Sequence, residues 1–208
     1  EVVGRCARDL GDYGRAEGLF AVARAAYEEL GDARGAAWID GMLGLLAQRQ
    51  GRPREAVAYQ RRAAEAFRNA GDPYHELRAL NGLALALWWA GDYLAARAIF
   101  AQTLELSERL GDGRIQESGL HNLGSLADLL GDYEESLELK TRAVARSRAA
   151  ENPMGVAVGL CNLGISLFKL GRYDEALRAL DEAIALDRAT GRRAGEAYCL
   201  HSRGQALA

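Results

Sequence analysis

The sequence predicts an all-α protein, a right-handed superhelical solenoid of antiparallel helix pairs. Turn signals recur at a constant step of 40 residues along the 208-residue chain. Between these turns the apolar residues follow the period of an α-helix, as Leu80, Leu83, Ala84 and Leu87 do at i, i+3, i+4 and i+7. Only three prolines interrupt the chain, so long helices are permitted.

Glycine marks the ends of the expected helices. Gly-Asp-Tyr begins at positions 11, 91 and 131, and Gly-Arg begins at 51 and 171. A second glycine series stands at 31, 71, 111 and 191, and Glu151 replaces glycine once in that series. Glycine adopts the left-handed conformation that closes a helix, and an aspartate after it can accept hydrogen bonds from the next helix. Turns this short predict antiparallel neighbours.

Small residues recur where the two helices of a pair should cross. The second helix of each pair also has a position, between two small residues, that is aromatic in some repeats and that we call the aromatic place. On the first helices, the small residues that follow leucine are Gly44, Ala84, Gly124 and Gly164. On the second helices, the matching small residues are Ala16, Ala56, Ala96 and Ala176. The aromatic place is occupied by Phe20 and Phe100, but Gln60 and Lys140 stand there in two other repeats. This pattern resembles the tetratricopeptide repeat, in the longer form found in Leu-Gly-Asn repeat adaptors, kinesin light chains and bacterial regulators with helical-repeat sensor arms. The resemblance covers essentially the whole chain.

The regular spacing of these turn glycines predicts a single repeat array over residues 1–208. We expect a partial repeat at 1–32, whole repeats at 33–72, 73–112, 113–152 and 153–192, and a partial repeat at 193–208. Natural solenoids end in polar caps, whereas this array is cut part-way through a repeat at both ends. We therefore expect the chain to be a fragment of a longer protein.

Composition excludes several classes of function. The net charge is −3 and no run of lysine or arginine exceeds two residues, which argues against a nucleic-acid partner. No stretch of 18 apolar residues predicts a membrane span. Three widely spaced cysteines, Cys6, Cys161 and Cys199, give no disulfide framework and indicate a reducing, cytoplasmic location. Lysine stands only at 140 and 169, and this preference for arginine indicates a bacterial genome of high GC content.

In a solenoid of this type the first helix of each pair lines the concave face. Counting from the Leu-Gly pair identifies first-helix residues that packing does not use. Asparagine can donate to and accept from a peptide backbone, and in the resembling adaptors the asparagines that match Asn122 and Asn162 hold an extended peptide. The competing interpretation is that these amides cap local backbone and that one of Trp88 and Trp89 packs against the next repeat. The predicted inner wall comprises Asn81, Leu85, Trp88, His121, Asn122, Ser125, Asn162, Ile165 and Phe168.

Catalysis and metal binding are poorly supported. His121, Cys161 and His201 occupy one place in three successive repeats, but such places lie about 10 Å apart, too far for the ~2.0–2.3 Å bonds of zinc. We expect no catalytic residue, no metal and no cofactor, and we interpret Cys161 as a small packing residue. The lysine and asparagine clamp that grips chaperone tails is also absent, because its places hold His121, Ser125, Cys161 and Ile165.

These observations predict a scaffold that holds an extended peptide or a partner segment, as the sensor or interaction arm of a larger bacterial protein. One alternative is an arm of a transcriptional regulator that senses a small-molecule effector. Another is a self-association module that forms homo-oligomers through the exposed ends of the array. An undetected enzyme activity is the weakest alternative.

Overall fold

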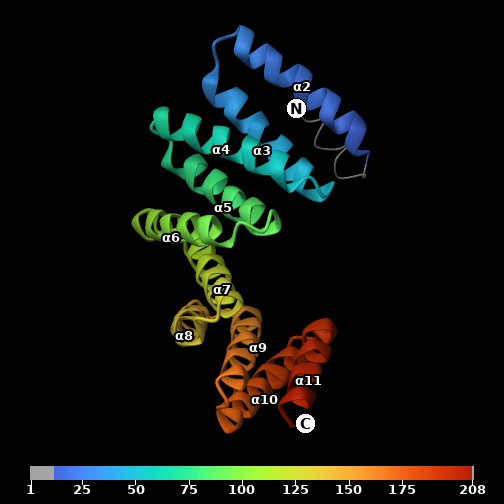
Figure 1. Cartoon of the computed structure of the whole chain (residues 1–208), viewed down its shortest axis with the longest axis vertical. Coiled ribbons are helices and arrows are strands. Elements are labelled where there is room, and N and C mark those ends of the chain that lie inside the picture. The colour runs from blue at the N-terminus through green and yellow to red at the C-terminus, as the bar shows by residue number, and fades with distance from the viewer. Residues whose placement is uncertain (1–11, 208) are drawn as a thin grey trace. The chain divides into compact units, whose positions relative to one another are not determined.

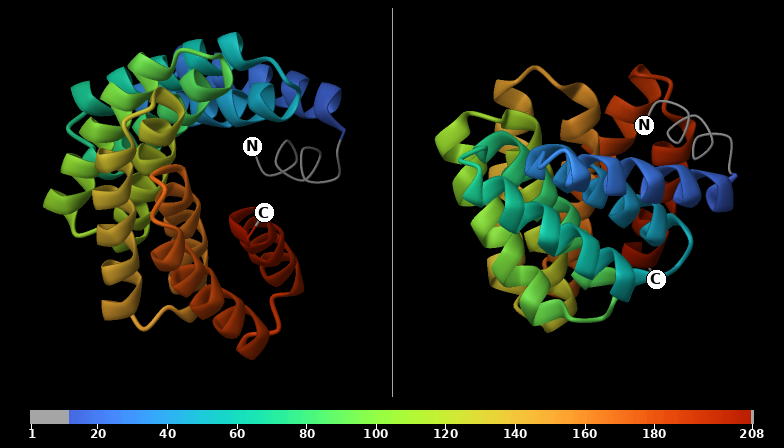
Figure 2. Two further views of the ribbon diagram at one scale, coloured as in Figure 1. Left: turned by 60° about the horizontal axis from the view of Figure 1, so that its bottom comes forward. Right: turned by 90° about the horizontal axis from the view of Figure 1, so that it is seen from above.

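The computed structural model describes residues 12–207, and these residues form ten α-helices joined by short turns (Figure 1). Within residues 13–110, and again within residues 113–207, consecutive helices lie side by side, as the two views of Figure 2 also show. The helices are α2 (Tyr13–Glu29), α3 (Ala33–Arg49), α4 (Pro53–Asn69), α5 (Pro73–Trp89), α6 (Tyr93–Leu110), α7 (Gly113–Leu130), α8 (Tyr133–Ala149), α9 (Pro153–Lys169), α10 (Tyr173–Ala189) and α11 (Arg193–Leu207).

The helices belong to two compact units. Unit 1 ends at Asp112 and contains α2 to α6, and unit 2 begins at Gly113 and contains α7 to α11. Within each unit the first helices of successive pairs also contact each other: α3 contacts α5, α7 contacts α9, and α9 contacts α11. Among the described helices, none is both long and apolar enough to cross a membrane.

The turn chemistry explains where the helices stop and start. The turn glycines from Gly31 to Gly191 all have positive φ, whereas Gly11 lies outside the described residues. Glu151 occupies the same place with φ of 49°, a conformation that costs a residue with a Cβ about 1–2 kcal/mol. The predicted helix-capping hydrogen bonds form at Asp12, Asp32, Asp72, Asp92 and Asn152, but the Asp132 side chain makes no such bond.

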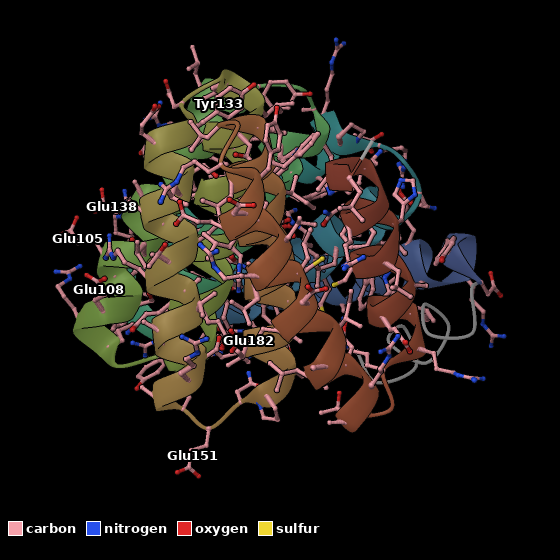
Figure 3. The ribbon with its side chains drawn as sticks, turned by 90° about the horizontal axis from the view of Figure 1, so that it is seen from below. Glu105, Glu108, Tyr133, Glu138, Glu151 and Glu182 are labelled. Atoms are coloured by element: carbon pink, nitrogen blue, oxygen red, sulfur yellow. The ribbon has the colours of Figure 1, made fainter. Side chains whose placement is uncertain are left out.

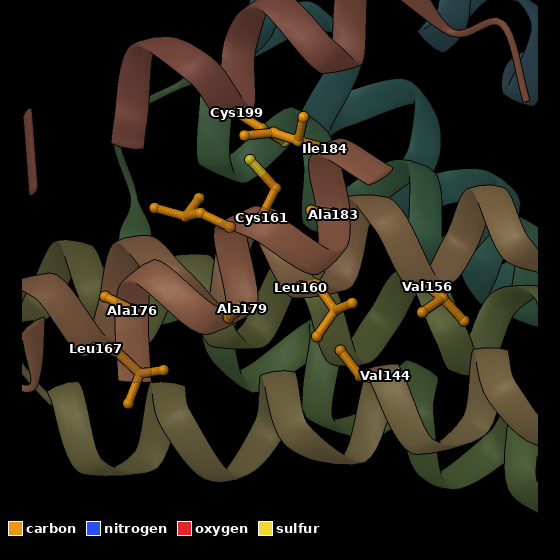
Figure 4. Packing of buried hydrophobic residues seen from close by; sticks show 11 residues of the cluster. Val144, Val156, Leu160, Cys161, Leu167, Ala176, Ala179, Ala183, Ile184 and Cys199 are labelled. Carbon is orange, nitrogen blue, oxygen red and sulfur yellow. The ribbon is translucent and has the colours of Figure 1, made fainter. Parts of the chain in front are cut away.

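The aromatic place of the second helices lies at the centre of each helix pair. Phe20 of α2 and Phe100 of α6 are fully buried there. The matching alanines, such as Ala56 and Ala96, are also fully buried, which lets the helix axes approach closely. In unit 2 the core cluster includes Leu180, which occupies the aromatic place of α10. Figure 4 shows other members of this cluster, among them Leu160 and Ile184.

Gln60 occupies the aromatic place in α4 and is only 4% exposed. Its amide donates a hydrogen bond to the carbonyl oxygen of Gly41 at 3.1 Å. A Cβ added at Gly44 or Gly82 would come within 2.7 Å of the Gln60 side chain, so both glycines provide the space that this amide fills. A polar residue in an apolar position is therefore matched by missing side chains on the two flanking first helices.

Asp72 ties two first helices of unit 1 together while it caps α5. Its carboxylate is 8% exposed and accepts hydrogen bonds from the Arg34 guanidinium and from Nδ1 of His75 at 2.9 Å. The His75 ring stacks on Phe67, with 5.0 Å between the ring centroids. Burial acts to raise the pKa of Asp72, but the hydrogen bonds from Arg34 and His75 outweigh it and hold the pKa at about 2.

This lowered pKa predicts acid sensitivity. Because the folded pKa lies below the unfolded value, the stabilisation is fully present above the unfolded pKa and is lost as the pH falls from about 4 toward 2. We expect urea unfolding to show a loss of about 1–2 kcal/mol over that window that Asp72→Asn does not share, after allowing for screening of the exposed Arg34. Equal pH dependence in the two proteins would contradict this assignment.

Candidate functional site

Asn122 and Asn162 occupy equivalent places on α7 and α9, one residue before the leucine of each Leu-Gly pair. Both are half-buried, and neither side-chain amide is hydrogen-bonded to the part of the chain that the structure describes. Since α7 and α9 contact each other, equivalent places on them lie about 8–10 Å apart. The two amides are therefore partly accessible on one face of unit 2, and neither is enclosed within its helix pair.

The other predicted residues of α7 are more involved in the fold. The Ser125 hydroxyl donates to the carbonyl oxygen of His121 at 2.9 Å, so its donor is already used. Both ring nitrogens of His121 are buried and have no hydrogen-bond partner among residues 12–207. Burial lowers the pKa of His121, which favours the neutral imidazole. Its Cε1 lies against α9, where a Cβ on Gly159 would come within 3.2 Å, so His121 packs between first helices.

The predicted apolar residues of α9 are half-buried. Phe168 packs against the core of unit 2, and its ring lies 5.6 Å from the ring of Tyr173. Ile165 is also half-buried, and Lys169 beside Phe168 is exposed. Phe168 thus contributes one part of its surface to the helix pair and leaves another part accessible.

In unit 1 the predicted wall residues lie on α5. Asn81 is half-buried, and its Oδ1 is buried with no hydrogen-bond partner in the described residues. Leu85 is half-buried. The Trp88 ring meets Phe100 of its own helix pair edge to face at 6.2 Å, whereas Trp89 is 69% exposed. Trp88 therefore packs within its hairpin, and Trp89 presents the exposed indole.

A buried ionic network lies beneath the Asn162 backbone. The Lys140 ammonium of α8 is 2.6 Å from Oδ2 of Asp128 on α7, 2.7 Å from the Ser166 hydroxyl and 3.3 Å from the Asn162 carbonyl oxygen on α9. Burial lowers the pKa of Lys140, and although burial also acts to raise the pKa of Asp128, the hydrogen bond from Lys140 lowers it. The network joins three helices and fixes the backbone that carries Asn162.

A hydroxyl beside an amine is also the arrangement of serine–lysine hydrolases. Here Ser166 is completely buried, so no substrate carbonyl can reach its Oγ. The amine is paired with a carboxylate, which favours its charged form and not the free base that such a mechanism requires. Among the described residues there is likewise no group of three His, Cys, Asp or Glu side chains placed to hold a metal ion.

Two features of this region do not follow from counting along the first helices. Lys140 in an aromatic place signals a buried charge, but its partner Asp128 lies on the preceding helix, where no sequence pattern identifies it. Asn162 also borders a cavity of about 210 Å³ between α9 and α11. Its other lining residues are Val158, Cys161, Arg192, Ala194, Gly195, Tyr198 and Cys199.

The outer surface carries acidic side chains. Glu138 on α8 and Glu151 in the following turn point away from the ribbon (Figure 3).

A larger cavity of about 510 Å³ lies between the second helices α2 and α4 of unit 1. Two arginines that line it, Arg24 and Arg62, are already paired with the buried carboxylate of Asp40.

Comparison with solved structures finds the same architecture at low sequence identity. BtubC (BKLC) from P. vanneervenii matches with a TM-score of 0.84 and 22% identity, over 91% of this chain and 79% of that chain. A signal transduction ATPase from Pyrococcus horikoshii with a tetratricopeptide repeat sensor matches with a TM-score of 0.87 and 14% identity, over 98% of this chain and 31% of that chain. A Rap protein in complex with competence and sporulation factor matches with a TM-score of 0.70 and 17% identity, over 89% of this chain and 52% of that chain. These likenesses show a shared fold.

Sequence comparison gives the family directly. No curated protein matches this sequence. Tetratricopeptide repeat models, however, match residues 2–69 and 75–149, and a second model of the same repeat matches residues 157–189. Together these matches span most of the chain and agree with its stacked helix pairs, and the chain belongs to the tetratricopeptide repeat family of protein-interaction scaffolds.

Proposed function

We propose that unit 2 holds an extended peptide, or an extended segment of a partner protein, across the first helices α7 and α9. The observation that carries this proposal is the repetition of a half-buried asparagine, Asn122 and Asn162, at one place on two helices that contact each other. Each amide can donate one hydrogen bond and accept another, which matches the alternating groups of a peptide backbone.

The spacing of the amides suits an extended chain. Equivalent places on packed helices are separated by about 8–10 Å, and an extended peptide advances about 3.3 Å per residue. The two asparagines would therefore bind backbone groups about three residues apart. Such contacts depend little on the peptide's side chains, so selectivity must come from neighbouring surfaces.

Two neighbouring surfaces can supply that selectivity. Ile165 and Phe168 expose part of their apolar surface on the same helix as Asn162. The cavity beside Asn162 measures about 210 Å³, below the range of about 300–1,000 Å³ typical of sites for small molecules. Its size and its mostly apolar lining suit one aliphatic side chain of a bound peptide better than a separate effector.

Unit 1 offers the corresponding residues of α5, Asn81, Leu85 and Trp88, for a binding site of the same kind. The Rap structure supports a peptide ligand, since that protein is in complex with competence and sporulation factor. We further propose that the chain is the interaction or sensor arm of a larger bacterial protein and acts in the cytoplasm, where Cys161 and Cys199 would remain reduced.

A small-molecule effector is the second candidate function. The cavity of about 510 Å³ in unit 1 falls within the size range of such sites. Asp40 pairs with both arginines and Glu28 pairs with Arg24, so the two positive charges are already balanced and a neutral polar effector would fit this site better than an anion.

The test is selection of peptides from a random library displayed on phage, followed by affinity measurement on synthetic copies. Asn122→Ala/Asn162→Ala should weaken the affinity for the selected peptides about 5- to 150-fold, because each asparagine contributes roughly 0.5–1.5 kcal/mol through its hydrogen bonds. Asn69→Ala/Thr141→Ala is the matched control, since both residues are exposed on second helices.

Three results would count against the proposal. Equal affinity of the wild type and the asparagine variant would mean that the peptide does not bind at this face. Capture of the same partners from the source cell by both proteins would lead to the same conclusion. Failure to select any peptide, together with a molecular mass that rises with concentration in light scattering, would favour self-association.

A further inference from the structure

Two cysteine side chains meet between α9 and α11. Cys161 is 3% exposed and Cys199 is fully buried, and both belong to the core cluster of unit 2. Figure 4 shows the Cys161 sulfur directed toward Cys199. One repeat earlier, 40 residues back, the same two places hold His121 and Gly159, which also lie against each other. The packing of successive first helices therefore brings these positions together.

A small solute can reach the pair through Cys161, which keeps a small exposed fraction, whereas Cys199 lies fully buried behind it. Cys161 and Cys199 both line the cavity of about 210 Å³ between α9 and α11, beside Val158 and Tyr198. A volume of that size admits water or a hydroperoxide but not a protein thiol. Burial in the core and access through this cavity are thus compatible.

A fixed ion pair lies next to Cys199. Asp187 is fully buried and is held by Arg192, with Nε–Oδ1 at 2.6 Å and Nη2–Oδ2 at 2.9 Å. The Cys199 sulfur lies 3.8 Å from Oδ2 of Asp187. This carboxylate favours the protonated form of Cys199.

The two thiols therefore differ in acidity. A hydrogen bond from Cys199 lowers the pKa of the Cys161 thiol and outweighs the opposing effect of burial. The same hydrogen bond and burial both raise the pKa of Cys199. Since the thiolate is the reactive form, Cys161 is the more nucleophilic member of the pair.

We propose that Cys161 and Cys199 are a reversible modification site, at which a hydroperoxide oxidises the two thiols to a disulfide that fastens α11 to α9. The two helices contact each other, and the two cysteines share one core cluster and one cavity. A disulfide needs a Cα separation of about 4.4–6.8 Å between them.

The chemistry balances with hydrogen peroxide as the oxidant. The Cys161 thiolate attacks one peroxide oxygen, the O–O bond breaks, and the products are a sulfenic acid and hydroxide, which takes up the proton that Cys161 released. The Cys199 sulfur then attacks the Cys161 sulfur, the S–O bond breaks, and the departing hydroxide takes the Cys199 proton. Two thiols lose two electrons, and one peroxide becomes two molecules of water. A dithiol such as dithiothreitol reverses the reaction by exchange.

The experiment uses the whole chain with Cys6→Ala, so that Cys161 and Cys199 are its only thiols. The protein is treated with hydrogen peroxide, its remaining thiols are alkylated with N-ethylmaleimide, and it is analysed by intact mass and peptide mapping. We expect the loss of two hydrogen masses, no alkylation and a cross-link between the two cysteine peptides. Oxidation should raise the melting temperature by about 5–10 °C, since the disulfide closes a long loop.

Single substitutions in the same background test the order of events. Cys199→Ala copies Ala79, the residue at the equivalent place in α5, and should leave a Cys161 sulfenic acid that dimedone traps. Cys161→Ala should slow peroxide oxidation of the remaining thiol about tenfold or more. Circular dichroism checks that both variants keep their helices.

Three outcomes would overturn the proposal, and the first needs no substitution within the pair. Full alkylation of both thiols after a peroxide treatment that oxidises free N-acetylcysteine would exclude the reaction. A cross-link between chains would show that the pair does not close within one molecule. Accumulation of sulfinic acid without a disulfide would show that Cys199 does not reach Cys161.

Discussion

Replacing Asp128 with alanine should lower the free energy of unfolding by about 3–5 kcal/mol, the loss expected when one member of a buried ion pair is removed. The side chain of Lys140 is only 2% exposed and that of Asp128 is 9% exposed, so water cannot replace the missing carboxylate. The ammonium would keep its hydrogen bonds to Ser166 and to the Asn162 carbonyl, but neither partner carries a negative charge.

The position of the tryptophans makes this effect measurable in one unit. All three tryptophans, Trp38, Trp88 and Trp89, lie in unit 1, so their fluorescence reports on that unit while circular dichroism reports on both. In urea, Asp128→Ala should shift the circular dichroism transition more than the tryptophan transition. Equal shifts of both would mean that the two units unfold as one.

A second substitution separates the lost charge from lost packing. Asp128→Ala/Lys140→Met removes both charges, and replacement of a buried pair by apolar groups is often nearly neutral. We therefore expect the double variant to recover most of the lost stability. A double variant as unstable as Asp128→Ala would contradict the assignment. The exposed pair Arg148 and Glu182 gives the control, since Glu182→Ala should cost less than about 1 kcal/mol.

Phe100→Ala should destabilise unit 1 by about 3–5 kcal/mol, the usual cost of removing a buried phenyl ring. Phe100 is fully buried in the aromatic place of α6, and its ring meets the Trp88 ring edge to face, with 6.2 Å between the ring centroids. The small residue Ala96 lies one turn earlier on the same helix and cannot fill the cavity. Urea unfolding followed by tryptophan fluorescence should show an earlier transition.

The emission of the folded protein should also change, because the cavity brings water or a new packing arrangement to Trp88. Leu94→Ala is the matched control: this side chain is on the same helix but 71% exposed, so its truncation should change stability by less than about 0.5 kcal/mol. Similar losses for Phe100→Ala and Leu94→Ala would be inconsistent with a core built around the aromatic place.

The order of the helices and their ends could be predicted because local chemistry determines them. The turn glycines adopt the left-handed conformation, and Asp32, Asp92 and Asn152 cap the following helices as the sequence indicates. Arg52 and Arg172 follow glycine in the same way but have no acceptor, and no side-chain cap forms there. The repeat boundaries themselves stay a prediction, since the structure divides the chain only at Asp112.

The candidate site was harder to predict because it depends on contacts between helices. A residue's position on a helix gives its direction from the axis but not the extent to which neighbouring side chains cover it. His121 and Asn122 are adjacent in sequence, yet both ring nitrogens of His121 are buried while the Asn122 amide remains partly accessible. The asparagine face as a binding site therefore stays a prediction that peptide selection must decide.

The polar residues in the aromatic place make the hairpins of this array differ from one another in the contacts that they require. Gln60 requires the bare backbone of Gly44 and Gly82, and Lys140 requires the carboxylate of Asp128. A shuffled array in which a different hairpin followed the one that carries Lys140 would keep Asp128, which lies in the same hairpin, but would lose the Ser166 hydroxyl and the Asn162 carbonyl that α9 supplies to the ammonium. Duplication or deletion of a hairpin by recombination would meet the same barrier, so the order of the hairpins is itself encoded in the interfaces between them.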